Sequence, residues 1–287
     1  MVPKFDRRQL LMAAAALPAA AFARRTSKMR FGLTTYQWGS EWDIPTLIAN
    51  CTKAKALGLE LRTSQKYAHG VEITSTEAQR REVKKRFAGS PVKLLGVASS
   101  ERFDWLDPAK VQAAIESSKA HVKLSHDIGG LGVRVFPNDF HREVPQEQTI
   151  AQVARAVNEV GKYAADYGQT IRLENHGSAG QLPTLRKILD QVEARNVRVK
   201  LNGGREDAGD FAARFALVKD RLGDTLHFHV LPDPQFPYQL QADLLMDAGW
   251  DGWWLLEAET KVPDRFAALV AQRQLWEQII KTSLARA

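Results

Sequence analysis

Eight short apolar segments alternate with eight helical segments along this chain, and no other feature limits its fold as strongly. The apolar segments cover residues 31–36, 59–63, 93–98, 132–136, 171–177, 197–202, 226–231 and 253–257. Strands that alternate with helices form parallel sheets, and eight such units in 287 residues are enough to close a barrel. We therefore predict an α/β protein built as a (β/α)8 TIM barrel in a single domain.

The helical segments carry start and stop signals that fit this alternation. Asp43 and Asp107 stand where N-caps are expected, each shortly before a first-turn proline, and Gly58 and Gly249 follow predicted helix ends. The rival fold is a doubly wound open sheet, which usually carries a glycine-rich loop after its first strand. Residues 37–40 read Gln-Trp-Gly-Ser, which is no such loop. The closed barrel is therefore the favoured interpretation.

The first 23 residues have the pattern of an export signal. The pair Arg7-Arg8 precedes an alanine-rich apolar run of about ten residues, the length of a signal core, and Ala21-Phe22-Ala23 fits a cleavage site. The run is too short to span a bilayer. We predict a twin-arginine-type signal peptide over 1–23 and a barrel domain over 24–287. The mature protein is then periplasmic or otherwise exported, with no membrane contact after cleavage.

The charge pattern and the cysteine content each argue against one feature: a nucleic-acid partner and an internal disulfide. The formal net charge is +7, but no run of lysine and arginine forms a stripe, so nucleic acid is not an expected partner. The single cysteine, Cys51, excludes an internal disulfide, and its place in a helical pattern predicts a small buried side chain.

The segment 171–177 places polar residues where a buried parallel strand should be apolar. Alternate residues of a strand share a face, so Arg172, Glu174 and His176 point one way while Ile171 and Leu173 point the other. Three polar groups on one buried face need hydrogen-bond or ion-pair partners. The inside of a barrel, near the carboxyl ends of its strands, can supply such partners.

Other predicted strands send polar residues of the same parity to this interior. They are Glu60 and Arg62, Arg134 and Asn138, Lys200 and Asn202, His227 and His229, and Glu257 and Glu259. A buried charge is tolerated only when it is paired. Arg62, Arg134 and Arg172 are therefore expected to pair with buried carboxylates, and the alternative is that they clamp an anionic group of a substrate.

Four of these residues fall at strand ends and define the candidate site: Glu174, Asn202, His229 and Glu257. Two carboxylates, one imidazole and one amide oxygen suit a divalent Mn, Co, Zn or Mg ion. Without a metal, two facing carboxylates can still act as acid and base. Glu174 and Glu257 are the predicted catalytic pair in both cases.

Five stretches of the chain carry a resemblance to a known family: LELRTSQKYAHGVE, GVRVFPND, RLENHG, HFHVL and GWDGWWLLE. Together they are similar to the xylose-isomerase-like TIM barrels, a family of sugar isomerases and epimerases, over essentially the whole mature chain. The resemblance implies that Glu174, His229 and Glu257 bind one divalent ion and that the two glutamates exchange a proton with a substrate carbon.

The chain departs from the family pattern at Asn202, where metal-binding members have an aspartate. The family's substrate-positioning histidine after that aspartate is also absent, because Gly203, Gly204 and Arg205 follow. His176 and His69 are available in its place. Barrel enzymes place substrate contacts on the loops after their strands. We therefore expect a set of substrate-binding residues comprising Arg62, Lys66, His69, Arg134, His176 and His227.

These observations predict an enzyme that isomerises or epimerises a small carbohydrate by moving a proton beside a carbonyl. The close alternative is a lyase that acts on an oxidised keto glycoside, since abstraction without return eliminates a leaving group. A non-catalytic sugar-binding barrel is the second alternative, and Asn202 favours it. A DNA-repair nuclease of the same fold would need many more histidine and acidic ligands at its strand ends. The sequence predicts neither the particular sugar nor the oligomeric state.

Overall fold

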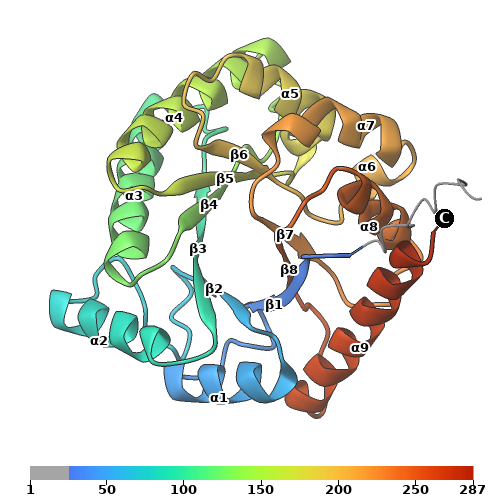
Figure 1. The fold of residues 1–287 in the computed structure, drawn as a ribbon. Helices are drawn as coiled ribbons and strands as arrows, with labels where there is room; N and C mark the ends of the chain where they lie inside the picture. The colour runs from blue at the N-terminus through green and yellow to red at the C-terminus, as the bar shows by residue number, and fades with distance from the viewer. Residues whose placement is uncertain (1–25, 287) are drawn as a thin grey trace, which may run out of the picture.

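The computed structural model describes residues 26–286, in which a ring of parallel strands is surrounded by helices (Figure 1). The strands are β1 Arg30–Thr34, β2 Gly58–Arg62, β3 Lys93–Arg102, β4 Gly132–Phe136, β5 Thr170–Glu174, β6 Val197–Lys200, β7 Thr225–Phe228 and β8 Trp253–Leu256. The predicted (β/α)8 barrel in a single domain is confirmed. The predicted signal peptide, 1–23, lies outside the described residues.

Helices follow the strands in the predicted order. The main ones are α1 Ile44–Ala54, α2 Glu77–Ala88, α3 Pro108–Asp127, α4 Gln146–Asp166, α5 Leu182–Asp190, α7 Phe211–Val218, α8 Tyr238–Asp247 and α9 Arg265–Leu284. Short turns add α6 Arg205–Ala208, η1 Ser178–Gly180 and η2 Lys219–Arg221. Within residues 26–286, no helix has both the length and the apolar content needed to cross a membrane.

The sheet runs β6-β5-β4-β3-β2-β1-β8-β7, so only the seam between β6 and β7 lacks a full ladder. Backbone contacts across that seam include a bridge between Val199 and Leu222 and hydrogen bonds from Gly223 N–H to Val199 and from His227 N–H to Leu201. The barrel is therefore nearly closed. The carboxyl ends of all eight strands meet at one mouth.

Several helices begin at a side chain that caps their first turn. Asp43, Asp107 and Asp264 each accept a backbone N–H bond in the first turn of the following helix. Thr76 and Gln79 form a reciprocal capping box at the start of α2. These caps satisfy amide groups that would otherwise lack partners, which fixes where each helix begins.

The amino-terminal end of the barrel is plugged by apolar side chains. Leu95, Trp253 and Leu255 form a separate buried cluster there. Gly58 makes room for it, because a Cβ at this position would lie 2.3 Å from the Trp253 ring. The plug fills part of that end, and beside it the buried Arg172 reaches Asp224, a 45% exposed carboxylate just before β7.

Candidate active site at the carboxyl end of the barrel

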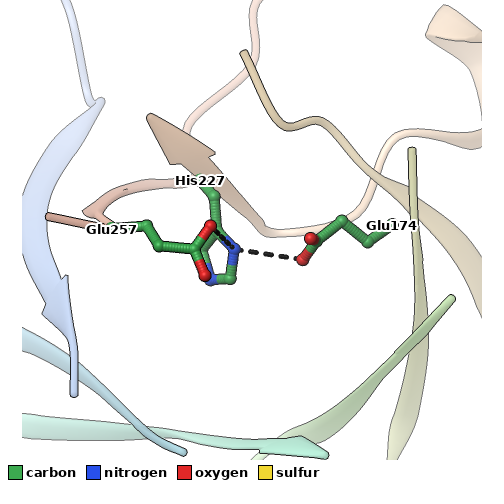
Figure 2. Close-up of side chains that lie close together, drawn as sticks. All are labelled: Glu174, His227 and Glu257. Atoms are coloured by element: carbon green, nitrogen blue, oxygen red, sulfur yellow. Dashed lines mark ion pairs between the residues drawn. The ribbon is translucent and has the colours of Figure 1, made fainter. Parts of the chain in front are cut away.

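Two buried carboxylates face each other across the mouth of the barrel. Glu174 is the last residue of β5, and Glu257 directly follows β8. Their exposed fractions are 1% and 6%. The His227 ring, from β7, stands between them, with Nδ1 3.0 Å from Glu174 Oε2 and 3.4 Å from Glu257 Oε2 (Figure 2). Residues 174 and 257 are distant in sequence, and the closure of the barrel brings them together.

The surrounding charges keep both carboxylates ionised. Burial alone would raise the pKa of Glu174, but Arg134 and His227 together bring it well below its usual range. Burial opposes ionisation of Glu257 too, yet His227 lowers its pKa to about 2. For His227, burial and Lys200 depress the pKa, and the carboxylates of Glu257, Glu174 and Glu60 outweigh them and raise it to about 10. The site therefore holds two carboxylates and an imidazolium at neutral pH.

Asn202 lies two residues beyond β6 and links the two carboxylates. Its Nδ2 donates to Glu174 Oε1 over 3.1 Å and to Glu257 Oε2 over 3.3 Å. Its own Oδ1 is buried and has no hydrogen-bond partner. An unpartnered buried acceptor is unfavourable unless another molecule supplies a donor. Asn202 therefore offers an acceptor to a ligand that enters the mouth.

Two arginines accompany the carboxylates, as their strand parity predicts. Arg134 Nε lies 3.2 Å from Glu174 Oε2, and Arg134 Nη1 donates to the carbonyl of Ser99 over 2.8 Å. Arg62 Nη1 lies 3.3 Å from Glu257 Oε1, and its guanidinium stacks on Tyr36 at 4.3 Å from the ring centroid. Arg134 is buried, whereas the Arg62 side chain is 17% exposed. Arg62 is therefore the better placed of the two to meet a substrate.

The predicted placement of His229 beside the carboxylates is wrong, because the strand ends too early. β7 stops at Phe228, so alternation no longer governs the direction of the next side chain. His229 Nδ1 lies 3.7 Å from Glu259 on the rim, and its backbone N–H donates to Tyr238. His227, predicted as a substrate contact, occupies the position between the two glutamates and is fully buried.

The loop after β2 also differs from the expectation for Lys66 and His69. His69 Nε2 lies 3.0 Å from the carbonyl of Arg62, and Nδ1 accepts the backbone N–H of Val71 over 3.0 Å. Burial lowers the pKa of His69 to about 4, so this ring is neutral. It anchors the loop instead of projecting into the mouth. Lys66 is exposed, and its backbone N–H is held by Glu72 over 3.3 Å.

Sequence reasoning missed Tyr67, which lies between Lys66 and His69 on this loop. It lines a hollow of about 440 Å³ together with Trp38, Thr260 and Lys261. Burial raises the pKa of the Tyr67 hydroxyl; of the nearby charges, Arg62 lowers this pKa and Glu257 raises it. Strand parity does not extend into a loop, so the only available signal was an aromatic residue next to a predicted substrate contact.

The other predicted contact, His176, lies on the rim above β4 and β5. It is exposed, and its ring stacks on Phe136 with centroids 4.7 Å apart and planes 25° apart. A second hollow, of about 490 Å³, lies beside Asn202 and is lined by residues 203–206, 229–230, 233–235 and 259–260. Both hollows fall in the size range of small-molecule sites, about 300–1,000 Å³. Neither hollow is lined by Glu174, Asn202, His227 or Glu257, so both lie on the rim around the candidate site.

The barrel and its mouth define the family of the chain. It belongs to the xylose isomerase-like TIM barrel family, whose model matches residues 48–283. Among solved structures, an L-ribulose 3-epimerase aligns with a TM-score of 0.75 at 16% identity, over 89% of this chain and 95% of that one. A 3-keto-D-glucoside 4-epimerase from E. coli aligns with a TM-score of 0.71 at 12% identity, over 88% and 100%.

A third structure, the IOLI protein with a bound zinc atom, aligns with a TM-score of 0.74 at 14% identity, over 90% of this chain and 100% of that one. No curated protein matches the sequence. At these identities the structural matches establish the shared fold.

The donor atoms at the mouth fit a divalent ion in their geometry. Ligand atoms of Glu174, His227 and Glu257 lie within 4.8 Å of one another. Two of them, Glu174 Oε2 and His227 Nδ1, are buried without hydrogen-bond partners, as is Asn202 Oδ1. Two carboxylates, an imidazole and an amide are a donor set that divalent metals accept. This buried group can hold such an ion once His227 gives up its Nδ1 proton.

Proposed function

We propose that this protein is a sugar isomerase or epimerase that moves a proton at a carbon beside a carbonyl group. The observation that carries the proposal is the pair of buried, ionised carboxylates, Glu174 and Glu257, on opposite sides of one mouth. A base on each side of a substrate carbon lets one carboxylate remove a proton and the other return it to the opposite face. The L-ribulose 3-epimerase and the keto-glucoside 4-epimerase of the same fold support this assignment.

The low pKa of Glu257 makes it a weak base. The site must therefore lower the pKa of the substrate C–H bond by stabilising the negative charge that develops on the neighbouring oxygen. Arg62 is the partly exposed cation beside Glu257 and can receive the oxygen on which negative charge develops. The orphaned Oδ1 of Asn202 can accept a substrate hydroxyl and fix the carbon between the two carboxylates. A divalent ion held by Glu174, His227 and Glu257 would supply further polarisation of the carbonyl.

The substrate we propose is a small unphosphorylated keto sugar or keto glycoside. The predicted export signal favours this class, because sugar phosphates are mainly cytoplasmic. Arg62 and Arg134, the cations beside the two glutamates, are already paired with carboxylates, which leaves little free positive charge there for a phosphate group. Polar acceptors and aromatic rings such as Phe136 suit a sugar ring.

The proposal is tested by incubating the full chain in D₂O with L-ribulose, D-fructose, D-tagatose and a 3-keto-glucoside. Proton NMR should show one C–H beside the carbonyl exchanging for deuterium and one epimer or isomer appearing. Glu174→Gln and Glu257→Gln should each lower the rate by about 10²–10⁴-fold. The control is Glu193→Gln, which changes a 75% exposed carboxylate paired with Lys162 just before β6, at the end of the barrel opposite the mouth, and should retain the rate.

Two results would count against an epimerase. Release of the aglycone with an unsaturated product would assign the lyase reaction to the same carboxylates. Binding of the sugars with no exchange at any carbon would assign a sugar-binding barrel instead.

A further inference from the structure

Three of the four oxygens of the two site carboxylates accept hydrogen bonds from the chain, and the fourth, Glu174 Oε2, lies beside the guanidinium of Arg134. Asn202 Nδ2 lies 3.1 Å from Glu174 Oε1, and Arg134 Nε lies 3.2 Å from Glu174 Oε2. On Glu257, Oε1 meets Arg62 at 3.3 Å and Oε2 meets Asn202 at 3.3 Å. An incoming cation needs the lone pairs of these oxygens. It must compete with hydrogen bonds at three of them, and at Glu174 Oε2 it meets the positive charge of Arg134.

The charges of the interior are balanced without an added ion. Four carboxylates are in ion pairs there: Glu60, Glu174, Asp224 and Glu257. The cations that pair with them are Arg62, Arg134, Arg172 and Lys200. A divalent ion would bring two more positive charges into a buried, low-dielectric interior, where uncompensated charge is strongly unfavourable.

We propose that Arg134 and Asn202 take over the role of a resident cation in this chain, so that the site is complete without metal and holds divalent ions only weakly. Arg134 supplies the positive charge beside Glu174. Asn202 supplies N–H groups to both glutamates, whereas a carboxylate at that position would repel both of them and require an ion between the three. The inference concerns ion binding alone and does not depend on the substrate.

The test is calorimetric titration of chelator-treated protein with MnCl₂, with thermal melts recorded beside it. The natural chain should bind Mn²⁺ with a dissociation constant no tighter than about the millimolar range, and EDTA should leave its melting temperature unchanged. In the double variant Asn202→Asp/Arg134→Gln one positive charge is lost and one negative charge is gained at the ion position. It should bind one Mn²⁺ per chain roughly 100-fold more tightly or better, and its melting temperature should rise with added Mn²⁺.

The matched control is Arg62→Gln, which also removes one guanidinium but from a partly solvated position, and it should change Mn²⁺ affinity much less. The proposal is overturned if the natural chain binds one Mn²⁺ in the micromolar range. It is also overturned if the double variant melts cooperatively and binds Mn²⁺ no better than the natural chain. If the double variant does not fold, the titration of the natural chain alone decides.

Discussion

The barrel contains two layers of charged side chains, and they differ in what surrounds them. In the lower layer Glu60, Lys200 and Arg172 are all fully buried, and Lys200 Nζ lies 2.8 and 2.9 Å from the two Glu60 oxygens. In the upper layer Arg62 and Glu257 reach the mouth, and Asn202 keeps an orphaned acceptor there. The charges of the lower layer pair with one another, whereas the upper layer has groups that a ligand can reach.

The difference shows that charge inside a barrel is no evidence of activity by itself. Arg172 is bound by Asp224 through two bonds of 2.9 and 3.0 Å, and it packs below the site. His227 joins the layers, because Nε2 lies 2.7 Å from Glu60 while Nδ1 faces Glu174 and Glu257. The lower layer therefore orients the imidazole that the upper layer uses. A structural role for the lower layer and a chemical role for the upper one can be separated by mutation.

The largest effect is expected from Lys200→Met. It leaves Glu60 buried and without the cation that binds both of its oxygens, and breaking a buried ion pair on one side costs about 3–5 kcal/mol of unfolding free energy. Urea unfolding followed by circular dichroism measures the change. The double variant Lys200→Met/Glu60→Gln is the control and should recover part of the loss, since no unpaired charge then remains. A loss below 1 kcal/mol in the single variant would show that the lower layer does not hold the barrel together.

A smaller effect is expected from the anchor of the loop above the site. Burial lowers the folded pKa of His69 to about 4, below the ordinary value of about 6.5. The unfolded chain therefore binds more protons between these values, and His69 contributes stability that is complete above pH 6.5 and is lost as the pH falls towards 4. The loss amounts to about 3 kcal/mol at most.

Replacing His69 with Gln should make the unfolding free energy less dependent on pH between 4 and 6.5. The amide N–H of the glutamine can replace the hydrogen bond to the Arg62 carbonyl. Unfolding free energies at pH 4.5, 5.5 and 6.5 measure the slope. Equal slopes in the natural chain and in the variant would contradict a neutral imidazole, because they would mean that His69 is protonated in the folded protein.

Sequence reasoning predicted the fold and much of the interior because both follow from regular periods. Alternation of strands and helices predicted the barrel. Strand parity predicted that Glu174, Glu60, Arg134 and Lys200 point into it, and the structure places them there in ion pairs. The predictions failed where the strands end. His229 lies one residue beyond β7 and turns away, and His69 lies on a loop whose hydrogen bonds have no sequence period. Tyr67 was missed for the same reason.

The most direct test of the two-layer account compares Glu60→Gln with Glu257→Gln, the same chemical change in each layer. Urea unfolding and sugar turnover are measured on both variants. Glu60→Gln should lose about 3 kcal/mol or more of unfolding free energy, because Lys200 and Arg172 stay buried without it. Glu257→Gln should lose about 1.5 kcal/mol or less, since Arg62 can turn to solvent, yet turnover should fall at least about 100-fold. A stable Glu60→Gln protein, or a Glu257→Gln protein with full turnover, would contradict the account.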